Sequence, residues 1–398
     1  MARSRRPLAL LSIAAALAML FTTAAPAAAD PLPGTPGTSS RLMDGVALYR
    51  RAFRLAHAGS DNGTIVASVV TFADGQGLGA IFESTDHGES FQRIGTVKDP
   101  GTTEGLCCAT LYELPQQVGD LPEGTLLWSA SVGQDGGDDR RMSLPVWASN
   151  DGGRTWRYLS TVATSANFGG LWEPEFAVSE DGRLVVYVSD ESQQPTYSQT
   201  LVQSTSTDGL TWTPLRNIVA ADDPALRPGM PVVRRLPSGS YLMSYEICGP
   251  GEDCRQRLRR STDGVHWGRP SLLGQRVESV HGLHFRHAPT LTWYDDGTAD
   301  GRLLTIGQMT YTDDGEVAPG NGNVVLYNEQ ASARGWQSTE AAVTINDPYD
   351  NYCPNYSSAL VPMHERNEVL GLSSAYDEQG VCSTYFRVVD LPGPLRNS

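Results

Sequence analysis

The chain has 398 residues and a formal net charge of −15, with 19% charged and 8% aromatic residues. A chain this acidic is a poor partner for nucleic acid and for anionic membrane surfaces, so we expect neither. Its length would ordinarily indicate two domains, but a repeat architecture can form a single domain of the same length.

The first 29 residues have the make-up of a secretory signal peptide. A basic start (Arg3, Arg5, Arg6) precedes an apolar run over residues 8–21 and three alanines before Asp30. The run is too short to span a bilayer comfortably, which favours secretion over a membrane anchor. Cleavage removes three positive charges and takes the net charge from −15 to −18. We therefore expect a secreted, extracellular protein with no membrane attachment.

Residues 30–40 are rich in Pro, Gly, Thr and Ser and predict a flexible lead-in. Residues 41–398 show almost no helical periodicity. Short β-branched and aromatic runs alternate there with turns of Gly, Asp and Pro, which is the pattern of all-β proteins. We expect this segment to form a single domain.

The predicted strands form six successive groups, at residues 51–97, 109–162, 175–219, 232–274, 290–344 and 358–389. In the fifth group the last strand is expected near residues 341–344. The sixth group offers only three strands, and residues 42–48 would supply the missing outer one. That pairing would close a ring of sheets and leave no open sheet edge.

Four similar turn sequences begin at Ser84, Ser149, Ser206 and Ser261, at intervals of 65, 57 and 55 residues. Each has an Asp that can bond its own backbone, a Gly that tolerates positive φ, and a closing aromatic residue. A unit that recurs at this interval indicates a propeller. The turns resemble the Asp-boxes of sialidase-like propellers, which have a structural role. The predicted fold is therefore an all-β, six-bladed, sialidase-like β-propeller.

Six cysteines in an exported chain indicate disulfides, with 15 possible pairings. Cys248 and Cys254 flank a short loop and can pair locally, while Cys353 and Cys382 fall in the same C-terminal stretch. Three alternatives stay open for the adjacent Cys107 and Cys108: a strained vicinal disulfide, two free thiols, or exchange with another pair.

No two cysteines or histidines have metal-ligand spacing, so we expect no metal and no cofactor. His281, His284 and His287 form a cluster at mixed spacing. We interpret His287 as a sugar contact rather than as a metal ligand.

The layout of a blade predicts where a site should lie. The first strand starts, and the second strand ends, at one end of an antiparallel blade. The repeated turns join third and fourth strands and so mark the opposite end. Glu173 precedes the first strand of the third group, and Glu246 ends the second strand of the fourth. The two carboxyls are expected to face one another across the central funnel, as glycoside hydrolysis requires.

We expect Glu173 to act as the acid, because burial beside Trp172 would raise its pKa, and Glu246 to act as the nucleophile. Glu175 is a competing acid, since strand alternation sends it the same way as Glu173. The plainer alternatives are a turn cap for Glu173 and an ion pair for Glu246. The residues expected to contact substrate are Arg51, Trp172, Arg227, Tyr245, His287 and Tyr356.

Trp172-Glu173-Pro174, residues 227–230 (Arg-Pro-Gly-Met) and Tyr245-Glu246 together resemble glycoside hydrolase family 93. The resemblance covers most of the mature chain in layout. That family consists of six-bladed exo-arabinanases, which release arabinobiose from the non-reducing end of linear α-1,5-arabinan with retention. The resemblance implies that Glu173 is the acid/base and Glu246 the nucleophile. It also implies a polysaccharide or oligosaccharide substrate, and we expect a monomer.

Two features depart from the family. They are the Cys107-Cys108 pair and the loop between Cys248 and Cys254. The loop directly follows Glu246 and can reshape the substrate pocket, which bears on the sugar that the pocket accepts.

A sialidase is the nearest alternative. It would use Tyr356 as nucleophile with Glu246 as its partner, Arg51 as the first of three arginines, and Asp74 as the acid. The third arginine is missing from residues 322–327, and losing that guanidinium weakens the capture of a carboxylate. A non-catalytic propeller that binds glycans or a protein is the other alternative, and it predicts that the two glutamates lie far apart or in ion pairs.

Overall fold

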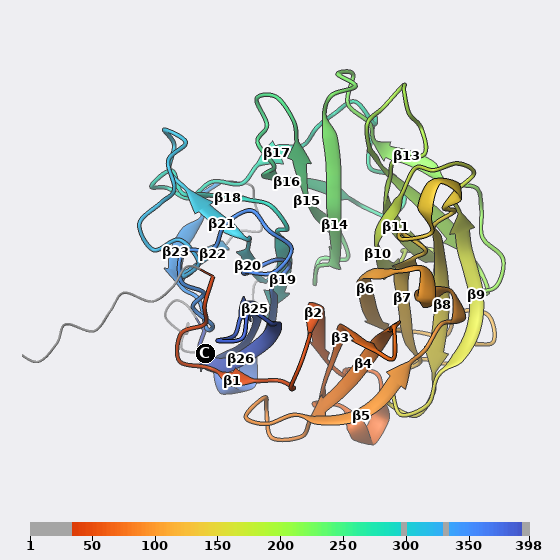
Figure 1. Ribbon diagram of the computed structural model, residues 1–398, viewed down its shortest axis with the longest axis horizontal. Helices are drawn as coiled ribbons and strands as arrows, with labels where there is room; N and C mark the ends of the chain where they lie inside the picture. The colour runs from red at the N-terminus through yellow and green to blue at the C-terminus, as the bar shows by residue number, and fades with distance from the viewer. Residues whose placement is uncertain (1–33, 296–300, 329–333, 392–398) are drawn as a thin grey trace, which may run out of the picture. The chain divides into compact units, whose positions relative to one another are not determined.

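Six antiparallel sheets make up the described part of the computed structural model, residues 34–295, 301–328 and 334–391 (Figure 1). The predicted signal peptide, residues 1–29, lies outside this part. Each of the first three sheets has four strands in chain order. These strands are β2 (Leu48–Arg54), β3 (Ile65–Ala73), β4 (Gln76–Ser84) and β5 (Gln92–Val97); β6 (Leu106–Glu113), β7 (Leu126–Val132), β8 (Ser143–Ser149) and β9 (Arg157–Thr164); β10 (Leu171–Val178), β11 (Leu184–Asp190), β12 (Thr200–Ser206) and β13 (Arg216–Val219).

The last three sheets follow the same plan with additions at the edges. The fourth carries two extra strands, and the sixth takes its outer strand from near the start of the described chain. Their strands are β14 (Arg227–Arg235), β15 (Tyr241–Cys248), β16 (Arg255–Ser261) and β17 (Gln275–Arg276), with β18 (His284–Arg286) and β21 (Met309–Tyr311); β19 (Thr290–Tyr294), β20 (Arg302–Ile306), β22 (Val324–Asn328) and β23 (Gln337–Glu340); β24 (Ala359–Met363), β25 (Glu368–Tyr376), β26 (Cys382–Asp390) and β1 (Ser40–Arg41).

The six sheets are arranged in a ring. Their first strands contact one another in the order β2, β6, β10, β14, β19, β24, and β24 contacts β2 again. Figure 1 shows the ring running from the orange β2–β5 sheet to the blue β24–β26 sheet. The prediction of an all-β, six-bladed propeller is therefore confirmed.

The strands are apolar because each blade packs between two neighbours. Every residue of β11, Leu-Val-Val-Tyr-Val-Ser-Asp, is buried, and so are the first seven residues of β3. A strand covered on both faces has a continuous apolar run instead of an alternating one. This is why the buried runs could be recognised in the sequence while the thin outer strands could not.

The repeated turns lie between third and fourth strands, as predicted. In the β8–β9 turn, Ser149 Oγ donates to Asp151 Oδ1 at 2.7 Å, and Thr155 N donates to the same oxygen at 2.9 Å. The other three turns contain the same serine-to-aspartate hydrogen bond. All four turns therefore mark the end of the ring that lies away from the starts of the first strands.

Three predicted outer strands are wrong in position. The fourth group was expected to end at residue 274, but its outer strand is β17 (Gln275–Arg276). Gln337–Glu340 forms β23, and Glu340 pairs with Val324 at the end of β22, so residues 341–344 run past the strand they were expected to join. In the sixth sheet Ser40–Arg41 pairs with β26, whereas residues 42–48 do not form the outer strand. Gly45 lies there in a left-handed turn (φ 81°), and Leu48 already begins β2.

Three disulfides join Cys107 to Cys108, Cys248 to Cys254 and Cys353 to Cys382. The two local pairings and the vicinal option are thereby confirmed. Three disulfides are consistent with an exported protein. Among the described residues, no helix has the length and apolar character needed to cross a bilayer.

Candidate active site

At one end of the ring, the start of every innermost strand has a left-handed backbone. Such a conformation costs a non-glycine residue about 1 kcal/mol or more and is concentrated at functional sites. In the first four blades it coincides with a register shift between the first and second strands. The residues, one per blade with φ between 46° and 61°, are Tyr49, Cys108, Glu173, Met230, Ala288 and Ser357.

Glu173 occupies this position in the third blade. Its Oε2 accepts hydrogen bonds from Ser189 Oγ at 2.6 Å and from Met230 N at 2.9 Å. Its own backbone N donates to Ser131 Oγ at 3.1 Å. Burial raises the pKa of the Glu173 carboxyl, and the hydrogen bonds from Ser189 and Met230 oppose that rise.

Glu246 is the sixth residue of β15 and is 8% exposed. Its Oε2 accepts a hydrogen bond from Ala288 N at 2.6 Å. Its Oε1 lies 3.4 Å from Cys248 Sγ, but a disulfide sulfur has no proton to donate. Burial, followed by the negative charge of Glu173, raises the pKa of Glu246 to about 8.

The two glutamates belong to one site. Glu173 is bonded to the backbone of Met230 in β14, and the preceding residue, Gly229, pairs with Glu246 across the β14–β15 ladder. Burial, and then the nearby charges of Glu173 and Glu246, raise the pKa of the Tyr356 phenol well above its usual range. Within the described residues, neither carboxyl forms an ion pair. The two carboxyls are therefore close enough for the charge of Glu173 to act on Glu246.

The electrostatics of the pair differ from the expected division of roles. Coupled carboxyls with raised pKa values hold one proton between them near neutral pH, which suits a reaction that needs one acid and one base. Two hydrogen-bond donors face Glu173 and one faces Glu246. This difference favours the proton on Glu246, although Glu173 was the expected acid.

Because the pKa of Glu246 rises on folding from 4.5 to about 8, Glu246→Gln should change how stability depends on pH. Between these values the folded wild type holds a proton that the unfolded chain has released, so its stability falls as pH rises. Glutamine has no such proton. We expect the free energy of unfolding of the variant to rise relative to that of the wild type across this window, by a few kcal/mol in total. Denaturant titrations at pH 5, 6.5 and 8 provide the measurement. A difference in unfolding free energy that is the same at all three pH values would contradict the raised pKa of Glu246.

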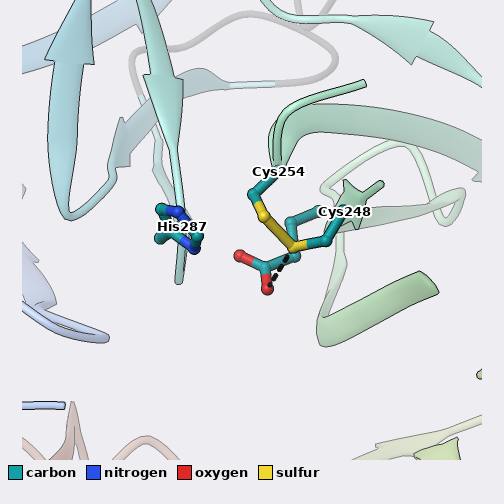
Figure 2. A group of neighbouring side chains, drawn as sticks. Cys248, Cys254 and His287 are labelled. Carbon is teal, nitrogen blue, oxygen red and sulfur yellow. Dashed lines mark hydrogen bonds between the residues drawn. A yellow bond between two sulfur atoms is a disulfide. The ribbon is translucent and has the colours of Figure 1, made fainter. Parts of the chain in front are cut away.

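Three of the predicted substrate contacts lie around the pair. Nη1 of Arg51 donates to Ser357 Oγ at 2.8 Å, and the guanidinium lies 4.6 Å from the centroid of the Tyr49 ring. Arg51 opposes the rise in the pKa of Glu173. Tyr356 contacts Met230, its hydroxyl lying 3.7 Å from the sulfur. His287 lies within 4.8 Å of a carboxylate oxygen of Glu246, and Figure 2 shows its ring near the Cys248–Cys254 disulfide.

Trp172 and Arg227 are held together by Glu191, a residue that the sequence reasoning missed. Glu191 Oε2 accepts from Trp172 Nε1 at 2.9 Å, and its Oε1 accepts from Arg227 Nη2 at 2.6 Å. The indole lies so close to Gly170 that a Cβ there would meet Nε1 at 1.9 Å. Glu191 directly follows β11, so the rule of looking just after second strands would have found it.

Two predictions about side-chain direction are wrong. Tyr245 is fully buried, and its hydroxyl donates to Leu273 O, so it packs inside the fourth blade instead of facing substrate. It precedes Glu246 on β15, and successive strand residues point to opposite faces. Glu175 does not share the direction of Glu173, because the register shift between Trp172 and Glu175 breaks the alternation.

Glu175 instead forms an ion pair with Arg234 at 2.5 Å and is 4% exposed. Both residues line a cavity of about 370 Å³ between the innermost strands. Neither Glu173 nor Glu246 lies in the wall of that cavity. Glu175 is therefore a structural carboxylate, and the candidate acids are Glu173 and Glu246.

No protein-family model matches the chain, and no curated protein sequence matches it. Among solved structures, an α-L-arabinanase of Penicillium chrysogenum in complex with arabinobiose has a TM-score of 0.72 at 25% identity. The match covers 90% of this chain and 99% of that one. The chain is structurally similar to glycoside hydrolases of family 93. The family 93 α-L-arabinofuranosidase of Fusarium graminearum, also solved with arabinobiose, matches with a TM-score of 0.70 at 25% identity, over 90% of this chain and 96% of its own.

This similarity to family 93 supports a glycoside hydrolase and agrees with the resemblance found in the sequence. A Hadza microbial sialidase also matches, with a TM-score of 0.56 at 13% identity, over 87% of this chain and 66% of the sialidase. Identity that low shows a shared fold alone.

Proposed function

We propose that this protein is a secreted, retaining exo-α-1,5-L-arabinanase that releases arabinobiose from the non-reducing end of arabinan. The observation that carries the proposal is the pair of buried carboxyls, Glu173 and Glu246, with raised pKa values at the mouth of the ring. The arabinobiose complexes of the two structural neighbours support the sugar.

In this mechanism Glu246 attacks the anomeric carbon and Glu173 protonates the departing oxygen. Both hydrogen bonds to Glu173 converge on Oε2, which leaves Oε1 to carry the proton toward the substrate. Glu246 must ionise as the substrate enters, so the shared proton passes to Glu173. Ser189 can accommodate this change, because a hydroxyl both donates and accepts. In the second half of the cycle Glu173 removes a proton from the water that releases the sugar.

The surrounding residues would bind the sugars. Trp172 offers a half-buried ring against which a sugar face can pack, and Glu191 fixes its orientation. Arg227, which is 38% exposed, retains donors for hydroxyl groups beside the same wall. Arg51, His287 and Tyr356 would contact the sugar next to the glutamates. Residues 1–29 would act as the export signal, and residues 41–398 as a single monomeric catalytic domain.

A sialidase remains the second candidate, on the ground that Tyr356 lies near Glu246. Three observations weigh against it. The raised pKa of Tyr356 keeps its phenol protonated, β22 offers no arginine, and Asp74 is exposed in the turn between β3 and β4. No guanidinium on β22 is placed to complete a three-arginine grip on a carboxylate.

A substrate panel with product sizing tests the proposal. Purified protein is incubated with debranched arabinan, other plant polysaccharides and a sialoside, and the products are separated by size. We expect a disaccharide from arabinan as the first and dominant product, with no activity on the sialoside. Sialoside turnover without arabinan cleavage would support the second candidate, and inactivity on the whole panel would indicate a binding protein.

A further inference from the structure

The loop that follows Glu246 brings four side chains with metal-binding atoms together. A carboxylate oxygen of Glu246, the sulfurs of Cys248 and Cys254, and a ring nitrogen of His287 all lie within 4.8 Å of one another. Figure 2 shows His287 on one side and the Cys248–Cys254 disulfide on the other. The spacing of cysteines and histidines in the sequence does not indicate this group, because His287 reaches it from a different segment.

The donor set matches the preference of Zn²⁺. Two thiolates, an imidazole and a carboxylate are its usual ligands, bound tetrahedrally at about 2.0–2.3 Å. In such a tetrahedron the ligand atoms lie roughly 3.3–3.8 Å apart. The two bonded sulfurs must therefore separate on reduction, while the more distant pairs, at up to 4.8 Å, draw closer. In the disulfide form the sulfurs carry no thiolate charge. Cleavage of one bond, between Cys248 and Cys254, would therefore complete the site.

The protein holds His287 in place independently of the disulfide. Its backbone N donates to Cys254 O at 3.1 Å. Its backbone O accepts from Gln308 N at 2.9 Å, whereas Asp350 Oδ2, at 3.7 Å from its Nε2, is beyond direct hydrogen-bond distance. Cys248 is half-buried, whereas Cys254 is buried, so we expect a small reductant to attack at Cys248.

We propose that reduction of the Cys248–Cys254 disulfide creates a Zn²⁺ site that captures Glu246 and switches the enzyme off. A dithiol reductant supplies the two electrons and two protons, and it becomes a cyclic disulfide as the Cys248–Cys254 bond breaks into two thiols. Zn²⁺ then displaces both thiol protons into solvent. A carboxylate bound to the metal cannot attack a sugar. The loss of activity rests on the proposed function, whereas metal binding does not.

The test compares the oxidised protein with protein reduced by dithiothreitol, with the reductant removed under anaerobic conditions. Each form receives Zn²⁺, is desalted, and is analysed for bound metal by mass spectrometry and for folding by near-UV circular dichroism. We expect about one Zn²⁺ per folded, reduced chain and none per oxidised chain. Co²⁺ in place of Zn²⁺ should give the thiolate charge-transfer absorption. Equal binding by both forms, or loss of the folded signal on reduction, would overturn the proposal.

Two double variants locate the site. Cys248→Ser/Cys254→Ser should bind no Zn²⁺ under the same treatment. Cys107→Ser/Cys108→Ser is the matched control, because the vicinal bond joins no separate segments, and it should bind like the wild type. Equal loss of Zn²⁺ binding in both variants would indicate that cysteines in general bind the metal, and it would contradict the proposed site. Glu246→Gln should weaken the affinity at least tenfold, since one charged ligand is lost.

The activity measurement separates the two proposals. On arabinan, Zn²⁺ should inhibit the reduced enzyme and not the oxidised enzyme, and a chelator should restore the rate. Zn²⁺ binding to an active enzyme without inhibition would overturn the capture of Glu246. A protein that binds one Zn²⁺ but never cleaves arabinan would contradict the proposed function and leave the metal site standing.

Discussion

Glu246→Gln is expected to lower kcat on debranched arabinan by about 10⁴-fold or more, with little change in KM. The amide has nearly the shape of the carboxyl and can still accept from Ala288 N, so substrate binding should survive. It cannot form the glycosyl-enzyme intermediate, because an amide is a far weaker nucleophile than a carboxylate. Steady-state kinetics with reducing-sugar detection provide the measurement.

A control separates lost chemistry from lost folding. Glu278→Gln changes an exposed carboxylate in the same blade, whose ion pair within the described residues is with Arg255, and it should keep kcat within about twofold of the wild type. Glu246→Gln should also be at least as stable as the wild type at pH 8, since the buried charge is gone. Stability that rises while activity falls is the signature of a functional group held at a cost to the fold. Activity above a tenth of the wild-type value would remove Glu246 from the reaction.

The sequence was sufficient for the parts of the fold that depend on burial and on turn chemistry. Both faces of strands such as β3 and β11 are covered, so their apolar runs are unambiguous, and the Ser-Asp turns locate the third and fourth strands. The outer strands are short and half solvated, and little in their composition marks them. This is why β23 and β1 lie a few residues away from their predicted positions.

The sequence could place the candidate site at particular strand ends, but it could not give the direction of the side chains there. Glu173 and Glu246 were found because the blade layout places strand starts and strand ends at one rim. The left-handed residue at Glu173 shifts the register, so alternation wrongly sent Glu175 the same way. The contacts from Ser189 and Ala288 come from other strands and segments, and only the folded ring brings them to the carboxyls.

Glu173→Ala should reveal which carboxyl is the acid, because its effect depends on the leaving group. On arabinan, whose leaving alkoxide needs a proton, we expect kcat/KM to fall by about 10²–10⁴-fold. On a nitrophenyl arabinobioside the leaving group departs without a proton, so formation of the intermediate should be nearly unaffected and its hydrolysis should become rate-limiting. A burst of nitrophenol in stopped-flow measurements would show this. Glu175→Gln is the matched control, since it alters the neighbouring buried carboxylate, and it should affect both substrates equally.

Azide then distinguishes the two roles by stereochemistry. In Glu173→Ala, azide can attack the glycosyl-enzyme without a base, so the rate should recover and the glycosyl azide should retain the substrate's configuration. In Glu246→Ala, azide replaces the nucleophile directly and should give the inverted product. The hydrogen bonds to the two carboxyls favour the proton on Glu246, so the opposite outcome has a physical basis. The two roles would be exchanged if Glu246→Ala gave a glycosyl azide of retained configuration and Glu173→Ala gave one of inverted configuration. The proton would then stay on Glu246 when substrate binds.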